Sequence, residues 1–364
     1  MSSSAFSSAQ ADESDADRLW DEFLVGTAFP HHQQNTLWAA FKRSFGWRVL
    51  RTTVRRDSEI VAGAQMLIRD MRPFGKLGYV PKGPVFQSFS PELAREMVSA
   101  LQATAQKEGV DVVLLQPSNE GWRFSELLPE FGFQPCPLDE LSTATTSLDL
   151  FCELDLLFAS MSESAQRRLR RSQTSGVVVR SGEAEDLPTF HRLLQATGKR
   201  QGFVPESLEY YRELWRVLKA SGQVLLFLSE YLGEPLSGQL VVAFGDTVTA
   251  KRIGWSGNHA KVGPNVALDW ATIRWAKANG YRRYDLDGIT REVAKIVLSG
   301  LKPPAWVADT PDGYKLRLGG DVTLTPLVHC WWRNRVLAKT WSAFGPLLLR
   351  SGEARRFASR LRSA

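Results

Sequence analysis

The sequence predicts an α/β fold made of two units with the same plan, each built on a mixed β-sheet. Two passages of the 364-residue chain repeat one order of elements: antiparallel strands, then an amphipathic helix, then a short buried strand. This order is typical of a mixed sheet covered by helices. A chain of this length also exceeds what one compact core usually holds, which favours two domains.

The first passage contains a strand meander, a helix and further short strands. Alternation of apolar and polar residues predicts the strands, and apolar residues at helical spacing predict the helices. The third strand leads into a turn formed by Pro81-Lys82-Gly83-Pro84. The predicted strands are 48–55, 59–68, 76–80, 112–115 and 145–150, and the predicted helices are 91–108 and 123–129.

The second passage begins with two helices and repeats the meander. Leu232-Gly233-Glu234-Pro235 predicts a hairpin turn between the first two strands. Gly280 follows the long third helix, where a glycine commonly ends a helix. The predicted helices are 184–198, 206–220 and 264–279, and the predicted strands are 223–231, 235–244, 246–254 and 284–286.

Composition is that of a globular protein with a modest positive charge. Hydrophobic residues make up 43%, charged residues 23%, and the net charge is +6. Such a balance favours anionic partners such as phosphate, nucleic acid or an acidic membrane surface, without choosing among them. The 12 Trp residues indicate either large cores or surfaces that stack on rings.

The cysteines and histidines predict neither a disulfide framework nor a metal site. Cys136, Cys152 and Cys330 are far apart and odd in number, and the five histidines form no metal-binding helix motif. This pattern favours a reducing cytoplasm. Residues 1–15 are polar and acidic and predict a disordered tail, with no signal peptide and no apolar run that could span a bilayer.

Two basic segments are candidates for binding anions. A predicted helix at 160–175 carries Arg167, Arg168, Arg170 and Arg171, which suit either a solvated face or phosphate. From Val328 onward the chain interleaves Trp and Phe with arginines, a pattern that suits peripheral contact with an anionic membrane. The same segment could instead pack onto the N-terminal domain.

A series of short motifs between residues 31 and 320 resembles the FemABX family, aminoacyltransferases that build the interpeptide bridges of peptidoglycan from aminoacyl-tRNA. Each motif alone is common, and their order and spacing together are specific. The motifs are Gln33-Gln34, Trp38-Ala39-Ala40-Phe41-Lys42 with Gly46-Trp47, Tyr79-Val80-Pro81-Lys82-Gly83-Pro84-Val85, Arg167 to Arg171 with Gly176-Val177-Val178-Val179, Lys199-Arg200-Gln201-Gly202-Phe203 with Tyr210-Tyr211, Pro264 with Trp270, Trp275-Ala276 and Gly280, Tyr284-Asp285-Leu286-Asp287-Gly288-Ile289, and Tyr314-Lys315 with Gly319-Gly320.

The resemblance implies two GNAT-like (acyl-CoA N-acyltransferase) domains with mixed central sheets, the second inserted into the first. We expect the N-terminal domain to comprise 16–150 and 321–364, and the second domain to comprise 151–320. It also implies a cytoplasmic monomer, working near the inner face of the plasma membrane. Its partners would be aminoacyl-tRNA and a UDP- or lipid-linked muropeptide.

The implied reaction needs no bound cofactor, because the aminoacyl ester of a charged tRNA is already activated. The enzyme must place an amine against the ester carbonyl and stabilise the developing oxyanion. By resemblance, Lys42 contacts the acceptor's phosphates. Lys315 sits beside the reacting carbonyl or the tRNA terminus, and Tyr314 stacks on a terminal base. Arg200 belongs to the family's Arg-x-Gly-Phe motif.

The predicted strand at 284–286 brings two acidic candidates to its carboxyl end. Functional groups often collect at that edge of an α/β sheet, so Asp285 and Asp287 are candidate binding residues. We expect Asp285 to cap and organise the turn that follows.

Three positions depart from the family pattern. Gln116 stands where the family often has an aspartate, and an amide cannot act as a general base at neutral pH. Glu206 stands near a basic phosphate contact, and Arg252 stands near a tyrosine. Charge lost at residue 206 could be regained at residue 252, or the acceptor could differ from the usual nucleotide-linked peptide.

Three alternatives stay open. An aminoacyl-tRNA-dependent ligase could act on a small peptide or amine in a biosynthetic pathway. An acetyl-CoA N-acetyltransferase would need an Arg/Gln-x-x-Gly-x-Gly/Ala loop at a helix start, and Lys261-Val262-Gly263-Pro264 lacks the glycine pair. A non-catalytic module could bind tRNA or anionic lipid through its basic surface.

Overall fold

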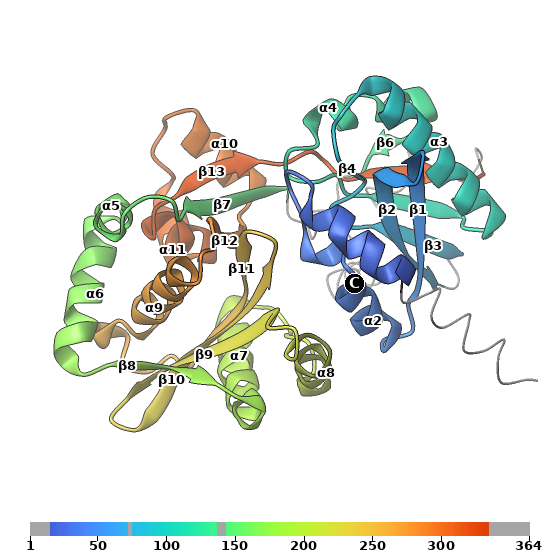
Figure 1. Ribbon diagram of the computed structural model, residues 1–364. Helices are drawn as coiled ribbons and strands as arrows, with labels where there is room; N and C mark the ends of the chain where they lie inside the picture. The colour runs from blue at the N-terminus through green and yellow to red at the C-terminus, as the bar shows by residue number, and fades with distance from the viewer. Residues whose placement is uncertain (1–14, 72–74, 137–142, 335–364) are drawn as a thin grey trace, which may run out of the picture. The chain divides into compact units, whose positions relative to one another are not determined.

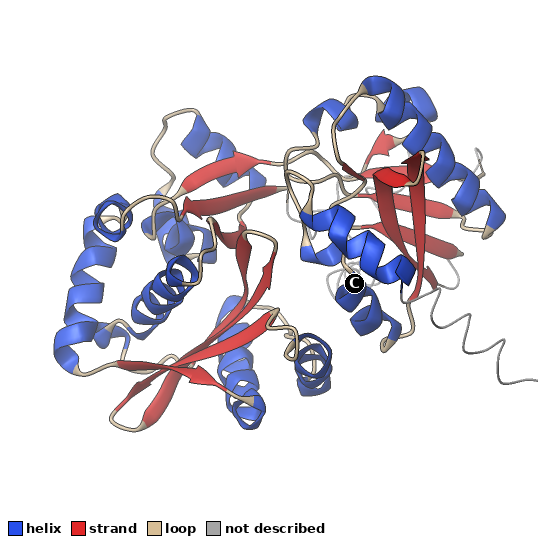
Figure 2. Cartoon of the chain, in the orientation of Figure 1, coloured by secondary structure: helices blue, strands red, loops and turns tan. Residues whose placement is uncertain are grey.

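The computed structural model describes residues 15–71, 75–136 and 143–334, and it divides into two compact units. Unit 1 is Met1–Leu141 with Thr325–Ala364, and unit 2 is Ser142–Leu324. The second unit is therefore inserted into the first. Each unit holds one seven-stranded mixed sheet flanked by helices (Figures 1 and 2).

The expected boundaries at 150 and 321 are wrong by a few residues, and strand pairing gives the reason. β7 (Ala144–Asp149) pairs with β12 (Arg283–Gly288) and with β13 (Asp321–Leu324), all in the sheet of unit 2. A strand belongs to the sheet that satisfies its backbone hydrogen bonds. Residues 144–149 and 321–324 therefore belong to the second unit.

The sheet of unit 1 has the order β1-β2-β3-β5-β14-β6, with β4 paired to β2. The predicted meander and the predicted buried strand are confirmed. The strands are β1 (Arg48–Arg56), β2 (Glu59–Asp70), β3 (Lys76–Val80), β4 (Val85–Phe86), β5 (Val112–Leu115), β6 (Gln134–Pro135) and β14 (His329–Trp332).

Helices cover both faces of this sheet (Figure 1). α3 (Pro91–Lys107) buries Met97 and Leu101 against one face, and α2 (Thr36–Arg43) buries Ala39 against the other. The single helix expected near 123–129 is wrong in extent. α4 (Trp122–Ser125) ends early, and a 3₁₀ turn, η2 (Leu128–Phe131), follows. Pro129 in that turn has no N–H to continue an α-helix.

The sheet of unit 2 has the order β13-β7-β12-β11-β10-β9-β8. The predicted meander is confirmed as β9, β10 and β11, and β12 joins it in parallel to β11. The bounds not yet given are β8 (Val178–Gly182), β9 (Val224–Tyr231), β10 (Glu234–Phe244) and β11 (Thr247–Trp255).

Helices of unit 2 also lie on both sides of their sheet (Figure 2). α9 (Pro264–Ala278) packs on β9 and β10 from one side, and α7 (Leu187–Gln201) packs on β10 and β11 from the other. Both helices match their predicted ranges closely. The remaining helices are α5 (Leu154–Ser160), α6 (Glu163–Ser175), α8 (Leu208–Leu218), α10 (Arg291–Leu298) and α11 (Pro311–Arg317).

Two predicted segments fall largely outside the described residues. The acidic tail at 1–15 is one. The basic, Trp-rich segment after Val328 is the other, and it is described only as far as residue 334. Within it Trp331 lies in the core of unit 1, and Arg333 forms an ion pair with Asp111 of the same unit. In the part of the chain that the structure describes, every helix is too short or too polar to cross a bilayer.

Candidate acyl-transfer site in the second unit

Asp285 holds together the carboxyl end of β12, where the register with β7 shifts between Asp285 and Gly288. Its carboxylate accepts hydrogen bonds from the Thr145 hydroxyl at 2.5 Å and from the N–H of Asp287 at 2.8 Å. Asp287 itself has a φ of 63°, a conformation that costs energy for most residues and that this bond stabilises. Asp285 therefore organises the irregular end of β12 and positions Asp287.

Asp287 lies among three cations. Burial alone would raise its pKa, but Lys251, Lys315 and Arg252 together lower it to about 2. Lys315 comes from α11, and its Nζ donates to the backbone oxygen of Gly288 at 2.6 Å. The fold thus brings together four of the residues singled out in the sequence, at the carboxyl end of β12. The structure adds Lys251, whose pKa is lowered by burial.

The two charge departures, Glu206 and Arg252, form an ion pair with each other. Arg252 Nη2 lies 2.7 Å from Glu206 Oε1, and the Tyr211 hydroxyl donates to Glu206 Oε2 at 2.7 Å. Burial would raise the pKa of Glu206, but Arg252 lowers it to about 2. The positive charge of Arg252 is therefore balanced within the protein by Glu206.

Breaking this pair should destabilise unit 2. We expect Glu206→Gln to lower the free energy of unfolding by about 2 kcal/mol near neutral pH, because it leaves Arg252 without its counter-charge. The loss should shrink as the pH falls from 4.5 toward 2, where Glu206 of the wild type is protonated. Urea unfolding of wild type and variant measures the difference. Partial recovery in Glu206→Gln/Arg252→Met is the matched check, and a variant as stable as wild type would contradict the pairing.

A buried polar network lies behind Tyr314. Asp269, from α9, is 1% exposed. It accepts hydrogen bonds from the Tyr314 hydroxyl and, at 2.6 Å, from the Gln239 side chain. Gln239 in turn accepts from the Tyr284 hydroxyl at 3.1 Å. Burial raises the pKa of Asp269 to about 6, although the two bonds favour the charged form. The network fixes Tyr314 by its hydroxyl.

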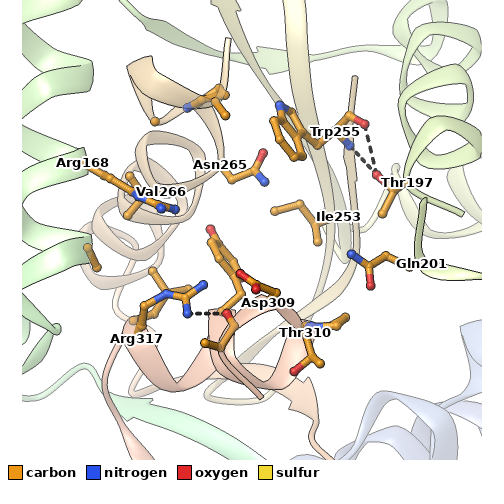
Figure 3. Close-up of a pocket in the computed structure, with 18 of the residues that line it drawn as sticks. Arg168, Thr197, Gln201, Ile253, Trp255, Asn265, Val266, Asp309, Thr310 and Arg317 are labelled. Atoms are coloured by element: carbon orange, nitrogen blue, oxygen red, sulfur yellow. Dashed lines mark hydrogen bonds between the residues drawn. The ribbon is translucent and has the colours of Figure 1, made fainter. Parts of the chain in front are cut away.

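Tyr314 forms part of the wall of a cavity of about 260 Å³ at the start of α9 (Figure 3). Three arginines from three helices line it: Arg168 of α6, Arg200 of α7 and Arg317 of α11. Burial and the charge of Arg168 lower the pKa of Arg317. In the described part of the chain none of the three forms an ion pair with a carboxylate. Such a concentration of unpaired cations suits an anionic ligand.

The cavity also offers ring faces and hydrogen-bonding groups. The Trp255 ring lies beside Arg200, with 4.7 Å between the guanidinium carbon and the ring centroid. Arg200 donates to the backbone oxygen of Trp255 at 2.5 Å, which fixes the pair. The side-chain oxygen of Asn265 is buried and has no hydrogen-bond partner among the described residues. An unmet acceptor in a cavity wall is a place where a ligand can donate.

The start of α9 is poorly suited to a pyrophosphate cradle of backbone amides. Pro264 occupies the first turn and has no N–H to donate. Gly263 has a φ of 69°, and a Cβ there would lie 2.7 Å from the backbone oxygen of Arg168. This glycine is therefore required for packing against α6. The charge of the cavity comes from arginine side chains instead.

The two candidates of unit 1 are buried within it. Lys42 is fully buried on α2, with its Nζ 4.6 Å from the ring centroids of Trp38 and Phe41. Gln116 follows β5 and accepts a hydrogen bond from the Tyr79 hydroxyl at 2.7 Å. Burial raises the pKa of Tyr79. The phosphate contact of Lys42 and a catalytic role for Gln116 stay predictions.

Family comparisons agree with this architecture. The FemAB family model matches residues 17–124, and a GNAT acetyltransferase domain model matches 159–293. The crystal structure of FemX superposes with a TM-score of 0.77 at 18% identity, covering 89% of this chain and 98% of that one. The chain is therefore similar to the FemABX family, in sequence over its N-terminal part and in fold over most of its length. Its fold is accordingly a pair of GNAT-like domains.

Curated relatives of this chain are lipid II:glycine glycyltransferases. The one from Staphylococcus saprophyticus is 27% identical over 233 residues, which is 60% of this chain and 56% of the relative. One from Staphylococcus aureus is 28% identical over 209 residues, which is 54% of this chain and 49% of the relative. The chain thus spans about half the length of the curated relatives it matches. A tandem GNAT protein from the clavulanic acid pathway shares the fold, with a TM-score of 0.53, 10% identity and coverage of 89% and 97%.

Several residues of the site were missed in the sequence, and one left a signal there. Asp269 lies on the apolar face of α9 with Val266, Ile273 and Ala276, and a carboxylate in such a stripe indicates a buried polar partner. Trp255, Arg317 and Gln239 left no comparable signal. Only the fold brings Trp255 and Arg317 to the cavity and Gln239 to Asp269. No group of three or more potential metal ligands occurs among the described residues.

Proposed function

We propose that this chain transfers an aminoacyl group from aminoacyl-tRNA to an amine of a lipid-linked peptidoglycan precursor. The cavity of unit 2 is the observation that carries the proposal. Its arginines suit the phosphates near a tRNA 3′ end, and the Tyr314 and Trp255 rings suit its bases. The names of the curated relatives support lipid II as the type of acceptor.

The reaction balances without a co-reactant. The acceptor nitrogen attacks the ester carbonyl and forms the C–N bond, and the C–O bond to the ribose of the tRNA then breaks. The proton lost by nitrogen ends on the departing ribose oxygen. We assign Lys315 to stabilising the oxyanion, because its side chain reaches the turn at Gly288 from the helix that also carries Tyr314.

Asp287 has a supporting role in this scheme. With a pKa held at about 2 it stays charged at neutral pH and is too weak a base to take the proton. Its charge instead balances Lys251 and Lys315 beside the reaction. The amine proton therefore passes to the leaving oxygen directly or through water.

A transfer assay tests the proposal. The full-length protein is incubated with a pool of tRNAs carrying labelled amino acids and with lipid-linked or UDP-linked muropeptide. We expect label to move to the lipid-linked muropeptide from one class of charged tRNA. Label that moves only to small amines would favour the biosynthetic ligase.

Acetyl-CoA provides the second arm of the same assay. We expect neither acetyl transfer nor a thermal shift with acetyl-CoA, since Pro264 and the arginine-lined cavity replace the amide cradle. Acetyl transfer without aminoacyl transfer would overturn the proposal.

A further inference from the structure

The end of α10, the loop that follows it and the start of η5 (Ala305–Asp309) expose large apolar side chains to solvent. Leu298 is 52% exposed, Leu301 is 64% exposed and Trp306 is 62% exposed, all within residues 298–306. In Figure 1 this segment is the orange loop that leaves α10 and returns toward α11. Single exposed hydrophobics are ordinary, but a cluster that includes Trp marks a surface that contacts something else.

Many of the backbone N–H groups of this segment are already used within the chain or are absent. Leu301 donates its N–H to the oxygen of Ile296 at 3.1 Å, and Val307 donates to the oxygen of Pro304 at 3.0 Å. Pro303 and Pro304 have no N–H at all. A partner would therefore gain little by pairing its backbone with the loop. What the segment offers is apolar side-chain surface.

Positive charge flanks these apolar side chains. Lys295 and Lys302 are both exposed, and Glu292 is the only acidic residue between 291 and 306. Trp with flanking lysines is the composition of protein segments that lie in the headgroup region of an anionic bilayer. Nucleic acid is a poorer match, because leucine and proline offer neither stacking nor hydrogen bonds to bases.

We propose that residues 298–306 dock on an anionic membrane surface, with Leu301 and Trp306 in the headgroup region and Lys302 against lipid phosphates. The inference rests on the proposed lipid-linked acceptor, which would be presented at such a surface. Docking through this loop would hold unit 2 where that acceptor is found. It requires no helix that crosses the bilayer.

Flotation of the full-length chain with vesicles tests the docking without any transfer reaction. Vesicles contain phosphatidylglycerol and phosphatidylethanolamine in equal parts, or phosphatidylcholine alone. We expect Leu301→Ser/Trp306→Ser to bind the anionic vesicles about tenfold more weakly than wild type. Lys302→Gln should bind them about fivefold more weakly and lose its deficit in high salt.

Phe151→Ser is the matched control. Phe151 is 82% exposed, but it lies far from the proposed docking segment. It follows Asp149 of β7, which pairs with Arg283 at the start of β12, whereas α10 follows the opposite end of β12. The Phe151→Ser variant should bind anionic vesicles like wild type. Any contribution of residues 335–364 to vesicle binding is common to all variants. Unchanged circular dichroism melting of the variants shows that the fold is kept.

Two outcomes would overturn the docking. One is equal vesicle binding by wild type and by Leu301→Ser/Trp306→Ser. The other is a loss of tRNA binding, rather than vesicle binding, in that variant, which would assign the loop to nucleic acid. Failure of the proposed function is distinguishable, because it appears as absent aminoacyl transfer to a detergent-solubilised acceptor, whatever the vesicles show.

Discussion

Replacing Lys315 with methionine is expected to lower the rate of aminoacyl transfer by a factor on the order of 10²–10³, the usual effect of removing one group that stabilises an oxyanion. The side chain anchors at Gly288 beside Asp287, and methionine keeps its length while removing the charge. Binding of charged tRNA should change by less than about threefold, because the three arginines of the cavity are untouched. Single-turnover kinetics separates the two quantities.

The matched control for this prediction is Lys107→Met, which removes an exposed lysine at the end of α3 in unit 1. It should transfer at the wild-type rate. Transfer by Lys315→Met within tenfold of wild type would remove Lys315 from the catalytic machinery. Loss of tRNA binding together with transfer would make it a binding residue instead.

Asp269 is expected to give unit 2 a stability that depends on pH. Its pKa is raised from 3.8 to about 6, so folding favours the protonated acid. The stabilisation that protonated Asp269 gives is complete below pH 3.8 and is lost as the pH rises through 6. The free energy of unfolding then falls by about 3 kcal/mol once Asp269 is fully ionised. Asp269→Asn should remove this dependence. The stability of wild type relative to the variant should therefore fall between pH 4 and pH 7.

Urea unfolding at several pH values, followed by tryptophan fluorescence, measures this difference. Asp269→Ala should cost about 3 kcal/mol at low pH, because it leaves the Tyr314 hydroxyl and the Gln239 amide without partners. Tyr314→Phe is the matched variant: it keeps the ring in the cavity wall and removes the bond to Asp269. Parallel pH curves for wild type and Asp269→Asn would contradict the assignment.

Much of the fold could be predicted from the sequence, because the pattern of apolar residues within short segments indicates most strands and helices. The strands at 59–68 and 235–244 are short, nearly continuous apolar runs between turn signals, which is typical of buried strands. The helices at 91–108 and 264–279 have apolar residues at helical spacing. β6 and β4 were missed, since each is two residues long. β14 was missed because its strand partners, β5 and β6, lie some two hundred residues earlier in the sequence.

The site residues also divide into those that local motifs predicted and those that only the fold brings together. Motif order led to Lys315, Tyr314, Asp285 and Asp287, which lie in short segments of unit 2. It could not reveal that Glu206 and Arg252 pair, because 46 residues separate them and only the fold brings the side chains within 2.7 Å. Nor could it assemble the cavity, whose three arginines come from three helices.

The nesting of one unit inside the other has a consequence for synthesis of the chain on the ribosome. β14 lies between β5 and β6, so the first sheet stays incomplete until residue 332 has been made. The inserted unit is complete slightly earlier, at residue 324, because Ala144 pairs with Leu324 and closes its own ends. We therefore expect the later-made unit to mature first. The earlier one would carry an open strand edge, exposed to chaperones, until its last strand arrives.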